Sequence, residues 1–290
     1  MSDAITERPE VTAQRRQSRI IYAILAGLMA IFLLFELKLP FLVGPQARGL
    51  YEAVEKVPAQ KPILLVLNWA PGTYGENYPQ TEALIQHFFL ARKPFAIFGI
   101  DPVGPSLGQE IAARQAERLG RTYGVDWVNI GYRPLQLPMI LGMTRDLPGT
   151  LKRDAQGTEL ATLPLMRGVH SARDLGMIID VTPSATLDIW IQYFHGAVGT
   201  PVGYAPTAVM APEAYPYLQS KQIVGMLAGI KGAAEYAALL QQRPDASLAW
   251  KYPPMRAMNA VSIAHVLIVV LIVLGNYQYF TRHRRREEQA

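Results

Sequence analysis

Two aspartates in apolar stretches are the residues of this chain best suited to chemistry. Asp101 directly follows the apolar run 95–100, and Asp180 lies at the end of another such run. Together they could bind Mg²⁺ or act as a general acid and base, with Glu76 as a third candidate catalytic residue. The alternative is structural: an Asp after a strand commonly caps the following turn or helix, because its oxygens accept hydrogen bonds from free backbone N–H groups.

Polar residues at the ends of these and neighbouring apolar runs are candidate ligand contacts. In an open parallel sheet, ligands bind outside the carboxyl ends of the strands, so side chains from several strand ends meet at one edge. The candidate ligand-binding residues are Asn68, Tyr74, Ser106, Arg133 and Thr182. This prediction rests on fold geometry, since no recognised motif includes these residues.

Known catalytic motifs are missing. Gly104 and Gly108 could cradle a phosphate, but the Lys-Ser/Thr of a P-loop does not follow, and ordinary turn chemistry explains them more simply. His170 has a Ser and an Asp nearby, but the chain contains no Gly-x-Ser-x-Gly, which favours a surface histidine. The chain has no cysteine, and its five histidines lack paired metal-ligand spacing. We therefore predict neither a metal nor a cofactor.

Aromatic loops indicate a protein interface. Trp69 and Tyr78 lie in a loop rich in Gly and Pro, and Tyr204 and Tyr215 lie in a second one. Tyr and Trp on such loops are typical of interfaces, although local loop packing would also explain them. His265 is a polar residue within an apolar run, where it could bind the other apolar segment or a neighbouring subunit.

The elements that must position these residues alternate along the chain. Short continuous apolar runs are typical of strands buried on both faces, and the segments between them have helical periodicity. We predict an α/β fold with a parallel, doubly wound, Rossmann-like sheet of about five strands flanked by helices. The expected strands are 62–68, 95–100, 127–132, 177–181 and 202–210, and the expected helices are 45–56, 81–93, 107–119, 186–195 and one or two within 214–240. Residues 142–173 read as a loop or insertion that ends in a helix near 164–174.

Two longer apolar segments bracket this domain. Residues 20–43 and 257–280 are each about as long as a transmembrane helix, for which roughly 20 apolar residues are needed. A cleaved signal peptide is the alternative for the first, but its apolar run exceeds the usual length. Clustered arginines in the tails 1–19 and 281–290 place both termini in the cytoplasm. The domain 44–256 would then lie in the periplasm or outside the cell, held at the inner membrane by two helices.

The charge of the chain argues against nucleic-acid binding. The formal net charge is +5, but residues 44–256 hold 19 Lys and Arg against 17 Asp and Glu, a net charge of only +2. Such a domain lacks the basic surface that binds phosphate backbones. The expected partners are the lipid bilayer and either a membrane protein or a second copy of the chain.

Three functions follow from these observations. The first is a non-catalytic scaffold or accessory subunit of a membrane protein assembly. The second is a membrane-bound hydrolase or phosphoryl-transfer enzyme with a carboxylate site at the sheet edge. The third is an extracytoplasmic sensor of a small ligand.

Overall fold

The computed structural model describes residues 9–34, 42–134, 136–245 and 254–287. The chain divides into two compact units, one of residues 41–254 and one that combines residues 1–40 with 255–290.

The larger unit is built on a parallel sheet, which confirms the predicted α/β class. Within the described residues the sheet has six strands, in the order β3-β2-β1-β4-β5-β6, and every neighbouring pair is parallel. The strands are β1 (Ile63–Leu67), β2 (Phe95–Gly99), β3 (Trp127–Tyr132), β4 (Met177–Thr182), β5 (Val202–Pro206) and β6 (Gly225–Met226).

The continuous apolar strands separate two cores. In β1, Ile63, Leu65 and Leu67 face one core, whereas Leu64 and Val66 face the other, and all five are fully buried. Burying one such side chain contributes roughly 1.5–3 kcal/mol, so a strand that is apolar on both faces is stable only between two helical layers.

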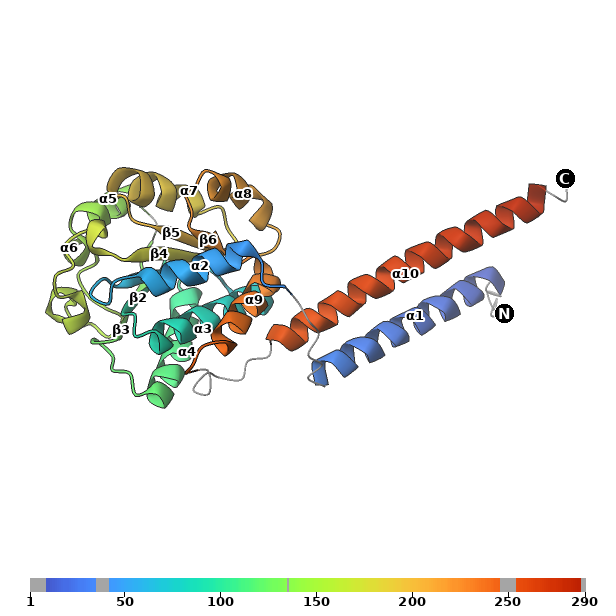
Figure 1. Ribbon diagram of the computed structural model, residues 1–290, viewed down its shortest axis with the longest axis horizontal. Helices are drawn as coiled ribbons and strands as arrows, with labels where there is room; N and C mark the ends of the chain where they lie inside the picture. Colours follow the sequence, from blue (N-terminus) through green and yellow to red (C-terminus); the bar gives the residue numbers. More distant parts are fainter. Residues whose placement is uncertain (1–8, 35–41, 135, 246–253, 288–290) are drawn as a thin grey trace, which may run out of the picture. The chain divides into compact units, whose positions relative to one another are not determined.

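Helices cover both faces (Figure 1). On the first face lie α2 (Pro45–Lys56), α3 (Tyr74–Leu90), α4 (Val103–Leu119) and α9 (Gly229–Gln241). On the second face lie α5 (Leu137–Arg145), α6 (Leu147–Leu151), α7 (Leu187–Trp190) and α8 (Ala211–Gln219). The predicted bounds of α2 are confirmed. The helix α4 ends at the predicted residue 119 but begins four residues before the predicted 107, and α3 begins seven residues before the predicted 81.

The strand order reverses between β1 and β4, and this decides which helices cover which face. The crossover helices α3 and α4 lead from β1 to β2 and β3 on the first face, and α7 and α8 lead from β4 to β5 and β6 on the second. Right-handed crossovers require this change of face when the direction reverses. The other half of the first face is covered by α2 and α9, which are the first and last helices of this unit and pack together.

The sixth strand corrects the prediction of about five strands. We expected one or two helices within residues 214–240, with a break near Gly225 or Gly229 and no strand. The structure has β6 at this break, between α8 and α9, where it pairs with β5. A Cβ on Gly225 would lie 2.2 Å from the backbone N of Leu50, so only glycine allows α2 to pass this close to the strand. A two-residue strand that contains glycine has no apolar run by which it could be recognised.

The region 142–173 also differs from its prediction. It is folded through α5, α6 and short 3₁₀ turns that cover the second face, and it is not a plain loop. In place of a helix near 164–174, it forms two turns at Pro164–Met166 and Ala172–Asp174. Gly168 separates them with a φ of +83°, a left-handed conformation that interrupts a helix.

The smaller unit contains α1 (Pro9–Leu34) and α10 (Pro254–Glu287). Among the residues that the structure describes, no helix is both long enough and apolar enough to cross a membrane. The two predicted spans are therefore not found there. The helices have other bounds than predicted, because α1 includes Arg15, Arg16 and Arg19 and α10 continues through the basic residues near its end. Residues 35–41 of the first predicted span, and the chain ends 1–8 and 288–290, lie outside the described residues.

Candidate functional site

Asp180 occupies the position where the strand order reverses, but it is enclosed. Its carboxylate accepts hydrogen bonds from Asn68 Nδ2 at 3.0 Å, Thr186 Oγ1 at 2.5 Å and Trp190 Nε1 at 2.9 Å. Asp180 has no exposed surface, and burial raises its pKa to about 7 although the three hydrogen bonds oppose this shift. The carboxylate therefore binds three donors of the chain and exposes no surface to a ligand or metal from solvent.

The other two candidate catalytic carboxylates are also used by the fold. Asp101 Oδ1 accepts the backbone N–H of Val103 at 2.9 Å at the start of α4. Glu76 Oε2 accepts the backbone N–H of Ala208 at 2.7 Å and so connects α3 to the loop after β5. Asp101 and Asp180 do not form a pair, because Asp101 follows β2 and Asp180 lies in β4, and these strands are on opposite sides of β1.

The candidate ligand contacts have structural partners as well. Asn68 bridges two strands, since its Nδ2 binds Asp180 and its Oδ1 accepts from the N–H of Ile100 at 2.9 Å. Ser106 Oγ donates to a carbonyl one turn earlier in α4, and Thr182 Oγ1 accepts from the N–H of the turn after β4. The guanidinium of Arg133 donates to the carbonyls of residues 132, 151 and 153.

The predicted interface residues fall into two groups. Trp69 and Tyr204 are buried inside the domain, and Trp69 Nε1 donates to the hydroxyl of Thr81 at 3.1 Å. Tyr215 is exposed. Tyr78 is half-buried, and its ring stacks on that of Tyr74, an exposed candidate ligand contact, with 4.5 Å between centroids. His265 lies exposed on α10, in the smaller unit.

Exposed apolar side chains follow the carboxyl ends of the strands. Tyr74 follows β1, Tyr132 ends β3 with Leu137 nearby, and Val209 follows β5 with 81 % of its surface exposed. Together with Tyr215 on α8, these residues define what we call the apolar edge. Exposed apolar residues that follow several strands of one sheet at the same end are candidates for a binding surface.

The sequence did not reveal a second polar cluster, which lies where α2, α3 and α9 meet. It comprises Tyr51, Glu55, His87, Tyr236 and Arg243, and we call it the helix junction. His87 is fully buried, with Nδ1 2.7 Å from the hydroxyl of Tyr236 and Nε2 2.9 Å from Glu55 Oε1. The ring of Tyr51 stacks on that of His87 at 4.4 Å, and Arg243 forms an ion pair with Glu55.

Charge and burial fix the hydrogen-bond directions in the helix junction. Burial lowers the pKa of His87, so its imidazole is neutral, and the hydrogen bond from His87 lowers the pKa of Glu55 to about 2. A carboxylate only accepts hydrogen bonds, which assigns the proton of His87 to Nε2 and makes Nδ1 the acceptor for the Tyr236 hydroxyl. Glu55 is therefore a stable anion and a weak base.

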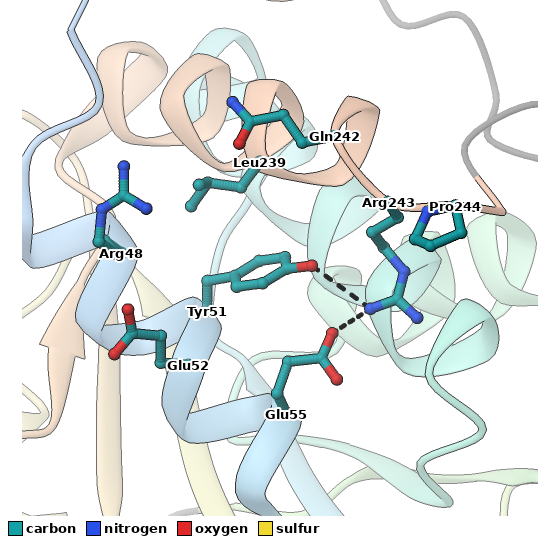
Figure 2. A pocket seen from close by; sticks show the side chains of 8 residues that line it. All are labelled: Arg48, Tyr51, Glu52, Glu55, Leu239, Gln242, Arg243 and Pro244. Carbon is teal, nitrogen blue, oxygen red and sulfur yellow. Dashed lines mark hydrogen bonds and ion pairs between the residues drawn. The ribbon is translucent and has the colours of Figure 1, made fainter.

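A pocket of about 340 Å³ opens above the helix junction (Figure 2). Its walls come from α2 and from the end of α9, and the pair of Glu55 and Arg243 lies at its floor together with Tyr51. This volume is in the range of small-molecule sites. Among the described residues no group of three or more acidic, His or Cys side chains is arranged to hold a metal ion.

Comparison with known proteins adds no relative. No protein-family model matches the chain, and neither a curated protein nor a solved structure is significantly similar to it.

Proposed function

We propose that this chain is a membrane-tethered α/β domain that acts as a non-catalytic scaffold or accessory subunit of a membrane protein assembly. One observation carries the proposal: the carboxylates at the sheet edge bind the chain's own donors, while the same edge exposes apolar side chains. An edge with this composition suits contact with another protein better than acid–base chemistry.

The apolar edge supports the choice of a protein partner. Val209 and Leu137 have more than half of their surface exposed, which costs hydration free energy unless another surface covers them. Tyr74 and Tyr215 add aromatic rings with polar hydroxyls, the combination that is enriched at interfaces. A membrane protein or a second copy of this chain would fit such a surface.

Tethering to the membrane is supported by the two terminal helices. The segment 261–275 in α10 has no formally charged residue, and α1 and α10 expose large apolar side chains such as Ile24, Ile31, Ile268 and Val269. Arginines outside both apolar segments support a topology with the two termini in the cytoplasm and the α/β domain in the periplasm or outside the cell.

The alternatives differ in their support. A hydrolase or phosphoryl-transfer enzyme would need an open carboxylate at the sheet edge, and Asp180 is enclosed by its three donors. A small-ligand sensor is the second candidate function, because the pocket above the helix junction offers it a site on the other side of the domain.

Site-specific photo-crosslinking in the producing cells tests the scaffold proposal. A photoreactive residue placed at Tyr74, Val209 or Tyr215 should form a crosslink to one defined membrane protein, or to a second copy of the chain. The crosslinked complex should then be purified in mild detergent and its mass measured under native conditions, which gives the stoichiometry.

Val125 provides the matched control. It is as exposed as Tyr74, at 49 % against 48 %, but it precedes β3 and so lies at the opposite end of the strands. We expect no crosslink from this position. A monomer without crosslinks from any position of the apolar edge would refute the proposal.

A further inference from the structure

The pocket above the helix junction has one wall that carries two free charges of opposite sign. Arg48 and Glu52 lie one turn apart on α2, and both line the pocket. Neither side chain has a hydrogen-bond or ion-pair partner among the residues that the structure describes, and Figure 2 shows both beside the opening. Residues four apart on a helix have their Cβ atoms about 5–6 Å from each other, so one small ligand can reach both.

The floor of the pocket is charged but already neutralised. Arg243 pairs with Glu55, its Nε donates to Asp245 at 2.8 Å, and Tyr51 accepts from its Nη1 at 3.3 Å. Behind this layer Glu55 is held by His87, which is itself held by Tyr236. The floor is therefore a preformed surface, and the free charges for a ligand come from Arg48 and Glu52.

The lining favours a ligand that is neutral overall. Two arginines and two glutamates line the pocket, so a simple anion or cation would meet as much repulsion as attraction. Leu239 and Pro244 add apolar contact, and the amide of Gln242 can donate and accept hydrogen bonds.

We propose that this pocket binds a small zwitterion of the amino-acid type, with its carboxylate on Arg48 and its ammonium group on Glu52. Arg binds a carboxylate through two parallel N–H groups, and a Glu carboxylate accepts from an ammonium group. The side chain of the ligand then contacts Leu239, which Figure 2 shows between Arg48 and Tyr51. This inference does not depend on the scaffold function, because the pocket and the apolar edge share no residue.

Titration calorimetry on the full-length protein in detergent tests the proposal. The probes are L-alanine, L-leucine and L-glutamine, each compared with its N-acetyl derivative and its carboxamide. We expect at least one amino acid to bind at least about tenfold more tightly than both of its blocked derivatives, because each loses one charge-assisted contact. Equal binding of a blocked derivative, or no binding of any of the three amino acids, would overturn the proposal.

Charge variants show whether the binding takes place in this pocket. Arg48→Gln and Glu52→Gln should each weaken binding at least about tenfold, while Arg145→Gln, a change at an exposed arginine on α5, should leave it unchanged. The double variant R48E/E52R keeps both charges with their places exchanged and should recover most of the affinity. If the single variants bind normally, the zwitterion does not occupy this pocket.

Discussion

The carboxyl edge of the sheet and the helix junction each contain a buried ionisable side chain, but they use it differently. Asp180 at the edge is surrounded by three donors that close over it. His87 in the helix junction forms hydrogen bonds with buried Tyr236 and with half-exposed Glu55, and Glu55 lines the pocket. A position where ligands commonly bind in this type of fold is therefore not by itself a binding site, because polar groups must also remain free to contact a ligand.

The largest loss of stability is expected for a substitution at the carboxyl edge of the sheet. Replacing Asp180 with Ala removes the acceptor for Asn68 Nδ2 and Trp190 Nε1. It also leaves Thr186 Oγ1 with only the long contacts of 3.4 and 3.5 Å to Thr182 and Ser184. We expect a loss of about 3–5 kcal/mol in the free energy of unfolding, measured by urea denaturation of the full-length protein in detergent. Asp101→Ala is the control, because it removes one cap at a helix start and should cost about 1 kcal/mol. Equal losses for both variants would mean that Asp180 is not enclosed as described.

A smaller loss of stability is expected for a substitution in the helix junction. His87→Phe keeps an aromatic ring against Tyr51 but leaves the buried hydroxyl of Tyr236 without its acceptor, at a cost of about 2 kcal/mol. Removing that hydroxyl as well, in H87F/Y236F, should recover part of the loss. The cycle of single and double variants measures this coupling. Strictly additive losses would contradict the hydrogen bond between the two residues.

The contributions of Asp180 and His87 to stability should also change with pH in opposite directions. The pKa of Asp180 is raised from 3.8 to about 7, so its contribution to stability is complete below pH 3.8 and is lost as the pH rises through 7. The pKa of His87 is lowered from 6.5, so its contribution is complete above pH 6.5 and is lost as the pH falls below that value. Unfolding free energies between pH 4.5 and 8 should show that Asp180→Asn removes the first dependence and His87→Phe the second. If either variant keeps the full pH dependence, the titration belongs to another group.

The smallest effect on stability is expected at the apolar edge. Val209→Ser changes a side chain that is 81 % exposed, so the free energy of unfolding should change by no more than about 0.5 kcal/mol. The same substitution should reduce the amount of co-purified partner, whereas Val125→Ser should change neither quantity. A large loss of stability at Val209 would show that this side chain serves the fold and not an interface.

Much of the fold could be predicted because the strands are recognisable by themselves. The runs around β1 and β2 are continuously apolar, and that of β4 is interrupted only by Asp180 before its final Thr182. This pattern is enough to indicate strands between two layers of helices. The strand β6 could not be found in this way, since its two residues, Gly225 and Met226, form no apolar run.

The sites were harder to predict because their partners are distant in the chain. The pair of Glu55 and Arg243 joins residues 188 positions apart, and it exists only because the first and last helices of the domain cover the same half of the sheet. A hint was present in α3, where His87 is a polar residue in a helix that is buried on nearly all sides. The enclosure of Asp180 was also indicated by the nearby sequence, because two of its hydrogen-bond donors, Thr186 and Trp190, follow it within ten residues.

The pairing of α2 with α9 also determines how a mechanical load would pass through this domain. Arg48, near the start of α2, and Gln242, just after α9, line the same pocket, so the chain enters and leaves the domain at neighbouring points (Figure 2). Tension between these two points acts across the contact of the two helices and peels them apart one contact at a time. The ion pair of Glu55 and Arg243 would carry that force before any strand of the sheet.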